Sequence, residues 1–138
     1  MLGRGAAVER VIRFTVPGQP CPYLRQTQGQ VKLVKIPLAS VKSRDALRVR
    51  ERIQRYLGYK DLVRLCSNRF DIDRNPKRKV FLNVMIYFAD EWWPCDPDNC
   101  RKGIQDAIYI NDRMVAGSVD FAVDEANPRV EVEIREAE

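Results

Sequence analysis

The segment Val80–Phe88 (VFLNVMIYF) constrains the fold more than any other part of the chain. It is the most apolar stretch of the sequence, and only Asn83 interrupts its hydrophobic residues. The β-branched and aromatic residues of the segment favour a strand. A strand that is apolar along nearly its whole length is typical of a sheet interior that is covered on one or both faces. We therefore expect this segment to be the central strand of the domain.

Four other segments carry the signal of strands. Residues 8–16 alternate apolar and polar side chains, and residues 31–36 form a short apolar run before a proline. Residues 115–123 and 129–134 also alternate, and the stretch between them contains the turn-forming pair Asn-Pro. Two alternating segments joined by a short turn-like stretch predict an antiparallel hairpin.

Helices are expected between these strands. Ser40 or Ser43 can cap a helix that runs to about Leu57, where Gly58 would end it. A second, shorter helix is expected over residues 60–68. Strands at both ends of the chain with helices between them predict an α+β, two-layer domain in which a mixed sheet packs against helices.

Length and composition set the broad class of the protein. A chain of 138 residues can bury one core without crosslinks, and we expect residues 1–7 to be a disordered leader and residues 8–138 to form a single domain. The sequence has no apolar run of the roughly 18 residues that span a membrane, and its first residues lack the apolar core of a signal peptide. We therefore predict a cytoplasmic protein with no membrane partner, and we expect its cysteines to be free thiols.

The basic residues are concentrated in one part of the chain. Residues 25–79 hold 16 of the 24 Lys and Arg residues but only 5 of the 19 Asp and Glu residues. Basic side chains on one helix face are a candidate surface for phosphates, although a solvated helix face explains the same pattern. The candidate nucleic-acid contacts are Arg25, Arg44, Arg48, Arg52, Arg55, Lys77, Arg78 and Lys79.

Acidic residues cluster just after the central strand. Asp96 and Asp98 flank Pro97, and this pattern fits a helix start, because proline is tolerated there and carboxylates favour the positive end of the helix dipole. The helix is expected to run to about Tyr109. At 100° per residue, it carries Asp98, Lys102 and Asp106 on one face.

Two interpretations fit this cluster. Crowded carboxylates repel one another unless a cation lies among them, and Mg²⁺ prefers oxygen ligands. Asp96, Asp98 and Asp112 could hold such an ion, provided that the strand after Asp112 lies beside the central strand. Alternatively, Asp96 is only a helix cap, and Asp98 and Asp106 only pair with Lys102 along the helix. The chain has no histidine, so any catalysis depends on carboxylates, lysine, tyrosine or a metal-bound water.

The pattern Asp96-Pro97-Asp98-Asn99-x-x-Lys102-x-x-x-Asp106-Ala107, followed by Asn111-Asp112-x-x-Val115, resembles the signature of the RusA family of Holliday junction resolvases. Residues 14–20 (FTVPGQP) are similar to that family's N-terminal strand and loop. The resemblance extends from about residue 12 to residue 135. Two positions depart from the family pattern. Cys95 replaces a basic residue that often precedes the first aspartate, and Asn111 replaces the first member of an Asp-Asp pair.

The resemblance implies roles for individual residues. The family's metal-binding catalytic aspartates correspond to Asp96, Asp98 and Asp112, its active-site lysine to Lys102, and its additional helix aspartate to Asp106. It implies a homodimer that uses Mg²⁺, with Mn²⁺ as a substitute, to resolve four-way DNA junctions in recombination and repair by paired phosphodiester hydrolysis. In this mechanism the metal activates a water and Lys102 stabilises charge on the phosphate.

Two further hypotheses remain at this point. Trp92 and Trp93 precede the acidic cluster, where they could stack on bases or pack in a core or subunit interface. The whole chain could also be a non-catalytic nucleic-acid-binding module whose acidic helix is structural. The two functions differ in whether the aspartates bind a metal ion.

Overall fold

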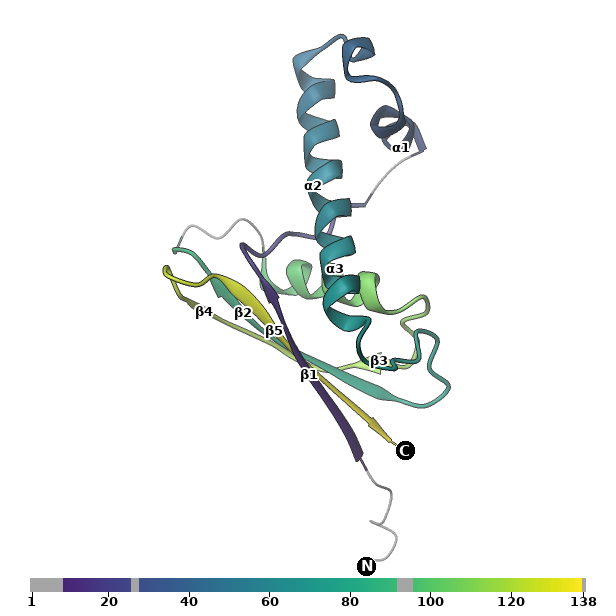
Figure 1. Cartoon of the computed structure of the whole chain (residues 1–138), viewed down its shortest axis with the longest axis vertical. Helices are drawn as coiled ribbons and strands as arrows, with labels where there is room; N and C mark the ends of the chain where they lie inside the picture. Colours follow the sequence, from purple (N-terminus) through teal and green to yellow (C-terminus); the bar gives the residue numbers. More distant parts are fainter. Residues whose placement is uncertain (1–8, 26–27, 92–95, 138) are drawn as a thin grey trace, which may run out of the picture.

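Strands form one mixed sheet in the computed structural model, which describes residues 9–25, 28–91 and 96–137 (Figure 1). Helices cover one face of this sheet, so the fold is a two-layer α+β arrangement, as the sequence predicts. The elements in chain order are β1 (Glu9–Pro17), α1 (Gln28–Lys35), the 3₁₀ helix η2 (Leu38–Ser40), α2 (Arg44–Ser67), β2 (Val80–Phe88), α3 (Pro97–Ile108), β3 (Val115–Ala116), β4 (Val119–Val123) and β5 (Arg129–Ala137).

The central position of β2 is confirmed. The strand order is β1, β5, β2 and then β3, with β4 also pairing with β2 further along the same edge. Strand β5 runs antiparallel to both β1 and β2, whereas β3 and β4 run parallel to β2. The parallel pairing requires a crossover, and α3 provides it by returning the chain from the end of β2 to its beginning.

The core lies between the sheet and helices α2 and α3. Alternate residues of β1, β2 and β5 are buried, as expected for strands with one covered face. Helix α3 contributes Cys100, Ile104, Ala107 and Ile108 to the same core, and α2 contributes Val63. The strands predicted over residues 8–16 and 80–88 are therefore confirmed, with one covered face.

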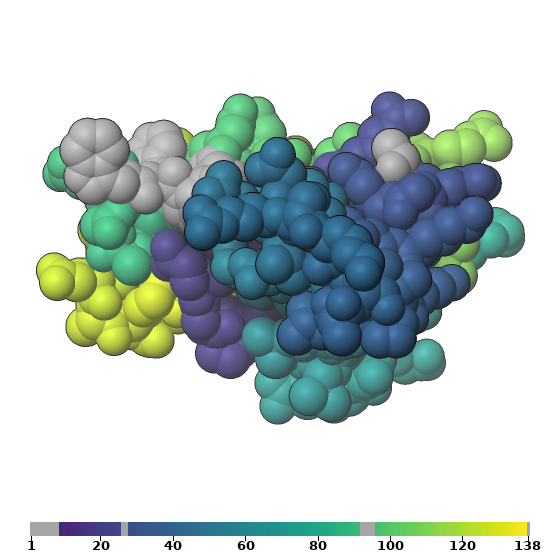
Figure 2. Space-filling view, turned by 90° about the horizontal axis from the view of Figure 1, so that it is seen from above, coloured from purple at the N-terminus to yellow at the C-terminus, as the bar shows by residue number. Residues whose placement is uncertain are grey.

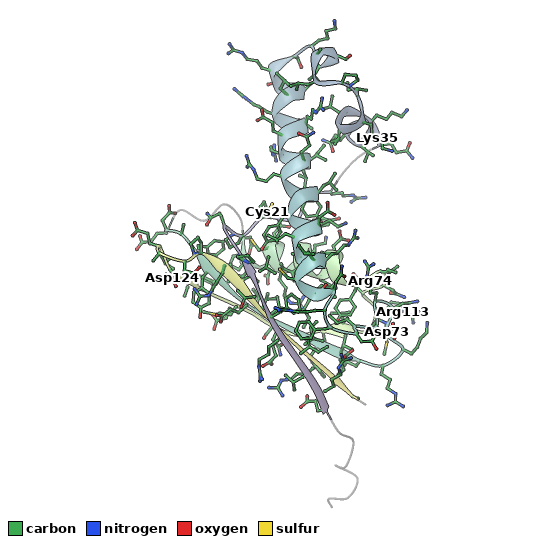
Figure 3. All side chains as sticks on the ribbon, in the orientation of Figure 1. Cys21, Lys35, Asp73, Arg74, Arg113 and Asp124 are labelled. Atoms are coloured by element: carbon green, nitrogen blue, oxygen red, sulfur yellow. The ribbon has the colours of Figure 1, made fainter. Side chains whose placement is uncertain are left out.

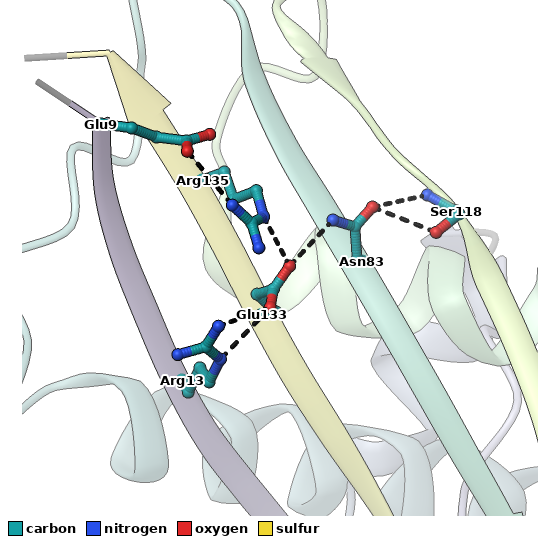
Figure 4. A network of polar contacts seen from close by, with 6 residues as sticks. All are labelled: Glu9, Arg13, Asn83, Ser118, Glu133 and Arg135. Carbon is teal, nitrogen blue, oxygen red and sulfur yellow. Dashed lines mark hydrogen bonds and ion pairs between the residues drawn. The ribbon is translucent and has the colours of Figure 1, made fainter.

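A network of polar side chains covers part of the opposite, open face of the sheet (Figure 4). Glu133 accepts hydrogen bonds from Arg13, Arg135 and Asn83, and thereby links β5 to both of its neighbours. The Asn83 side chain in turn accepts hydrogen bonds from the backbone and hydroxyl of Ser118. The network therefore connects β1, β5 and β2 with Ser118, which lies between β3 and β4.

The strand predicted over residues 31–36 is wrong. Residues 31–35 belong to α1, which packs against α2 at a distance from the sheet. Val31 and Val34 are half-buried and lie three residues apart, which matches the period of a helix. The same short apolar run also fits a strand, so the sequence alone does not distinguish the two. A strand at this place would have no neighbour to pair with.

The predicted break at Gly58 is also wrong. One helix, α2, continues from Arg44 to Ser67 through Gly58. Gly58 is exposed, and tertiary packing on both sides of it outweighs its low helix propensity. Of the two candidate caps, Ser40 and Ser43, the structure confirms Ser43, because its hydroxyl accepts a hydrogen bond from the Ala46 amide at 3.0 Å.

The predicted hairpin of residues 115–123 with 129–134 is not formed. Strands β4 and β5 lie on opposite sides of β2, so the turn between them crosses the end of the sheet rather than joining neighbours. Local alternation showed correctly that both segments contain strands, although residues 115–123 form two strands, β3 and β4, separated at Gly117 and Ser118. It contains no information about their partners. The pairing depends on the long apolar strand β2, which accepts neighbours on both edges.

Some sequence expectations fall on other parts of the chain. The leader, Trp92, Trp93 and Cys95 lie outside the described residues. Among the described cysteines, Cys21 and Cys66 are free, whereas Cys100 takes part in a disulfide bond, which corrects the expectation of free thiols. Within the described ranges, no helix has the length and apolar character needed to cross a membrane.

Candidate metal and nucleic-acid site

Helix α3 begins at the acidic cluster as the sequence predicts. Asp96 is the N-cap residue, and its carboxylate accepts a hydrogen bond from the Asp98 amide at 3.1 Å. Pro97 occupies the first turn, where its missing N–H costs nothing. Both carboxylates are exposed at the positive end of the helix dipole. This end of α3 therefore presents two adjacent acidic groups to solvent.

The loop after β1 is attached to the first turn of α3. The Tyr23 amide donates to the Asn99 carbonyl oxygen at 3.1 Å, and the Asn99 side chain donates to the Tyr23 carbonyl oxygen at 3.2 Å. Pro20 and Cys21 of the same loop are buried. The reciprocal hydrogen bonds fix Tyr23 beside the acidic end of the helix.

A hollow of about 450 Å³ joins the acidic end of α3 to the arginine face of α2. Asp96 at the start of α3 and Arg52 and Arg55 of α2 all line the hollow. The structure thus brings together one predicted metal ligand and two predicted phosphate contacts. The lining residues are Cys21, Pro22, Tyr23, Leu24, Arg52, Arg55, Tyr56, Asp96 and Asn99.

The other two predicted arginines of this face lie further along an arm of the molecule. We call residues 28–57 the arm, because α1 and the first half of α2 project beyond the sheet in Figure 1 and lie nearest the viewer in Figure 2. Arg44 and Arg48 are exposed near its tip. At 1.5 Å per residue, Arg44 to Arg55 spans about 16 Å, so the arginine face is an extended strip that ends at the hollow.

Asp106 contacts α2. Its Oδ2 atom accepts a hydrogen bond from the Tyr56 hydroxyl at 2.8 Å and forms an ion pair with Lys60 Nζ at 2.9 Å. Burial raises the pKa of Asp106, but hydrogen bonds from Lys60 and Tyr56 lower it by more, so that this pKa lies below the usual range of an aspartate. These contacts lock α2 against α3, which is a structural role that spacing along one helix could not reveal.

Lys102 lies against an aromatic ring. Its ammonium nitrogen is 4.4 Å from the centre of the Tyr23 ring, within the range of a cation–π interaction. The Tyr23 ring packs edge-on against Tyr56, with the ring centres 5.7 Å apart. Sequence reasoning places Tyr23 in a loop that could touch a ligand, but it did not identify Tyr23 as a partner of Lys102, because this contact depends on the attachment of the loop rather than on a motif.

Arg101, the neighbour of Lys102, points toward the sheet. Its guanidinium donates to the carbonyl oxygens of Leu82 and Ala116, with Nη2 at 3.1 Å from each. These carbonyls lie where the neighbour of β2 changes from β3 to β4. Burial lowers the pKa of Arg101. The residue therefore stabilises the sheet edge beneath α3.

Asp112 lies at the opposite end of α3 from Asp96. The strand that follows Asp112 does lie beside β2, which was the condition set by the sequence. The two strands are parallel, however, so Asp112 is near the beginning of β2, whereas Asp96 follows its end. About 20 Å of helix separates the two positions. Figure 3 labels the adjacent Arg113 in the same region of the view as Arg74, whose side chain donates to the Ile108 carbonyl oxygen at the end of α3.

The second basic group also lies at the beginning of β2. Lys77, Arg78 and Lys79 are exposed and surround a hollow of about 270 Å³, together with the acidic residues Asp73 and Glu136. A nine-residue strand is about 30 Å long, so this group is well separated from Arg52 and Arg55. Arg25, the last predicted contact, is exposed in the loop that follows Tyr23.

The fit of a metal ion differs among the predicted ligands. No group of three or more Asp, Glu or Cys residues in the described part of the chain is arranged to hold a metal. Asp96 and Asp98 suit an ion such as Mg²⁺, which commonly takes one or two protein carboxylates and completes its shell with water and substrate phosphate. Asp112 does not fit the same ion within one chain.

Comparison with known proteins adds no relationship. No protein-family model matches the chain, and no curated protein matches its sequence. The resemblance to the RusA family therefore stays a prediction that depends on the residues quoted above.

Proposed function

We propose that the protein is a Mg²⁺-dependent endodeoxyribonuclease that resolves four-way DNA junctions by paired phosphodiester hydrolysis. The observation that carries this proposal is the hollow in which the acidic end of α3 faces Arg52 and Arg55. A hydrolytic site on DNA needs carboxylates for a cation and, beside them, fixed positive charge for the phosphates. The resemblance of the acidic motif to the RusA signature supplies the specific substrate.

The residues of the chain divide into three roles. Asp96 and Asp98 would hold Mg²⁺, which when bound lowers the pKa of a water and polarises a phosphate. Lys102 stabilises negative charge on a phosphate oxygen at the exposed face of α3. The strip from Arg44 to Arg55 binds a DNA arm by neutralising its phosphates.

A four-way junction requires two cuts, and its arms are close to two-fold symmetric. A homodimer with two-fold symmetry would present two equivalent sites to it. Lys77, Arg78 and Lys79 would then contact a different part of the DNA from the arginine strip, because the length of β2 separates the two groups. The predicted cytoplasmic location is compatible with such a substrate.

A second candidate function is a nucleic-acid-binding module without catalysis. Two observations favour it over a resolvase. Asp112 is remote from Asp96, and Asp106 is engaged with Tyr56 and Lys60. In this case the arginine strip binds nucleic acid in the same way, but the aspartates hold no cation.

The decisive experiment incubates the protein with an end-labelled four-way junction in the presence of Mg²⁺. A resolvase produces symmetric nicks that EDTA abolishes, and Asp98→Asn removes cleavage while junction binding in a gel-shift assay persists. Asp61→Asn, at an exposed aspartate of α2, is the matched control and should cleave normally. Binding by the wild-type protein without Mg²⁺-dependent nicks would establish the second candidate instead.

A further inference from the structure

Lys102 contacts the aromatic ring of Tyr23. Among the ion pairs of the described residues, none includes Lys102, although Asp98 and Asp106 lie one turn away on either side along α3. The ammonium nitrogen instead lies 4.4 Å from the ring centre of Tyr23. A lysine on an exposed helix face can adopt many side-chain conformations, so this contact selects among them.

We propose that Tyr23 is a positioning residue that holds the Lys102 ammonium group at the acidic end of α3, where the substrate phosphate binds. This inference rests on the proposed function, because it assigns the phosphate as the partner of Lys102. The spacing along α3 alone would suggest that Asp106 orients the Lys102 side chain; we assign this role to Tyr23 instead.

The first support is the rigid attachment of Tyr23. Its backbone amide and carbonyl both bond to Asn99, at 3.1 Å and 3.2 Å. Asn99 is in the first turn of α3, three residues before Lys102. Since helix side chains lean toward the N-terminus of the helix, Lys102 extends toward the turn to which Tyr23 is attached.

The second support is a chain of contacts behind the ring. Tyr23 packs edge-on against Tyr56, and Tyr56 is fixed by its hydrogen bond to Asp106, which also pairs with Lys60. Gly103 lies against both residues, because a Cβ atom there would be in ordinary van der Waals contact, 3.5 Å from the Tyr23 amide nitrogen and 3.6 Å from the Tyr56 ring. The ring is thus supported from α2 as well as from α3.

The arrangement has a chemical consequence. An aromatic face attracts an ammonium group without neutralising its charge, whereas a carboxylate partner would form an ion pair and weaken its attraction for phosphate. Tyr23 therefore fixes Lys102 without pairing it with a carboxylate. Tyr23 also lines the hollow that contains Asp96, Arg52 and Arg55, so the residue that holds the ammonium group borders the groups proposed to bind the phosphate.

The contact itself can be tested without any assay of activity. In protein labelled with ¹³C at the lysine ε-carbon, the ring current of Tyr23 should shift the Lys102 ε-proton resonance upfield, and Lys102→Arg assigns that resonance by removing it. Tyr23→Phe should preserve the shift, because the ring remains. Tyr23→Leu should abolish it. An unshifted wild-type resonance, or one that Tyr23→Leu leaves unchanged, overturns the inference.

Junction cleavage with Mg²⁺ tests the consequence. Tyr23→Leu should lower kcat about tenfold, as expected when a charged group loses its position, with KM unchanged and with Tyr23→Phe equal to wild type. The double variant Tyr23→Leu/Lys102→Met should cleave no more slowly than Lys102→Met, because both changes remove one function. Additive losses, or normal cleavage by Tyr23→Leu, contradict the positioning role.

Two further outcomes are distinguishable. If Tyr23→Leu does not fold, Asn99→Ala replaces it. This change keeps the side chains of Tyr23 and Lys102 and removes only the hydrogen bond from the Asn99 side chain to the Tyr23 carbonyl oxygen. A reduced upfield shift together with a reduced kcat supports the inference, and no change in either overturns it. If the wild-type protein cleaves no junction, the proposed function fails, and the resonance of Lys102 alone decides whether Tyr23 holds it.

Discussion

The Tyr56 hydroxyl donates a 2.8 Å hydrogen bond to Asp106 Oδ2 and so joins the middle of α2 to the last turns of α3. Lys60 strengthens the same junction, because its ammonium group pairs with the same carboxylate oxygen. The acidic end of α3 and the arginines of α2 belong to these two helices. The junction therefore fixes the distance across the hollow between Asp96 and Arg55, on which the proposed function depends.

Removing the Tyr56 hydroxyl should destabilise the fold. Tyr56→Phe retains the buried ring but deletes a hydrogen bond to a charged group, and we expect the free energy of unfolding to fall by about 1 to 2 kcal/mol. Tyr59→Phe is the matched control. The Tyr59 hydroxyl is buried without a hydrogen-bond partner in the described structure, so its removal should be neutral or stabilising. Urea denaturation of the two variants measures the contrast, and equal losses would refute it.

The stability provided by Asp106 should depend on pH. Its pKa is lowered in the folded state, so the charged form stabilises the fold above the unfolded pKa, near pH 4. This contribution is lost as the pH falls through the lower, folded pKa. Asp106→Asn should therefore be less stable than wild type at pH 7, and the difference should shrink below about pH 4. Urea unfolding at a series of pH values tests this, and a difference that grows in acid would reverse the assigned sign.

The arginine strip should govern the salt dependence of DNA binding. If Arg52 and Arg55 each neutralise one phosphate, the double change to alanine should reduce the slope of log affinity against log salt by about 2. Arg13→Ala serves as control, because Arg13 lies on the open face of the sheet, away from the hollow and from the second basic group. Fluorescence anisotropy of a labelled junction at several salt concentrations gives the slopes. Identical slopes for both variants would remove the arginines from the interface.

Local signals in the sequence predicted those features that short segments determine by themselves. The strand Val80–Phe88 and the start of α3 at Asp96 follow from patterns within a few residues, and such patterns also limited the cap of α2 to Ser40 or Ser43, of which Ser43 is the cap. Gly58 was misread, because packing along α2 overrides its propensity. The segment of α1 was misread because a short apolar run fits two periods.

Long-range pairing accounts for the remaining differences. The partners of β4 and β5 depend on the two free edges of β2, which no local pattern describes. The same division applies to the candidate site: the parts that neighbouring residues form were predictable, and the parts that strand pairing brings together were not. Asp96 and Asp98 are neighbours in the chain and lie together, but the position of Asp112 depends on the direction of β3 relative to β2. Tyr23 contacts Lys102 across 79 residues of sequence, so only the folded structure could identify the pair.

The edge of the sheet beneath α3 should tolerate no side chain at Gly117. This residue has a φ of +136°, which L-residues rarely adopt, and a Cβ atom there would overlap the carbonyl group of Leu82. Gly117→Ala should therefore lower the free energy of unfolding by at least about 2 kcal/mol.

Gly58 provides the opposite case in the same chain. It lies within α2, and a Cβ atom there would meet nothing within 4 Å. Gly58→Ala should therefore stabilise the protein by about 0.5 to 1 kcal/mol, because alanine loses less backbone entropy in a helix. The thermal unfolding temperature should therefore fall for Gly117→Ala and rise for Gly58→Ala. A Gly117→Ala protein as stable as wild type would show that Gly117 does not lie against the Leu82 carbonyl group as closely as the structure has it.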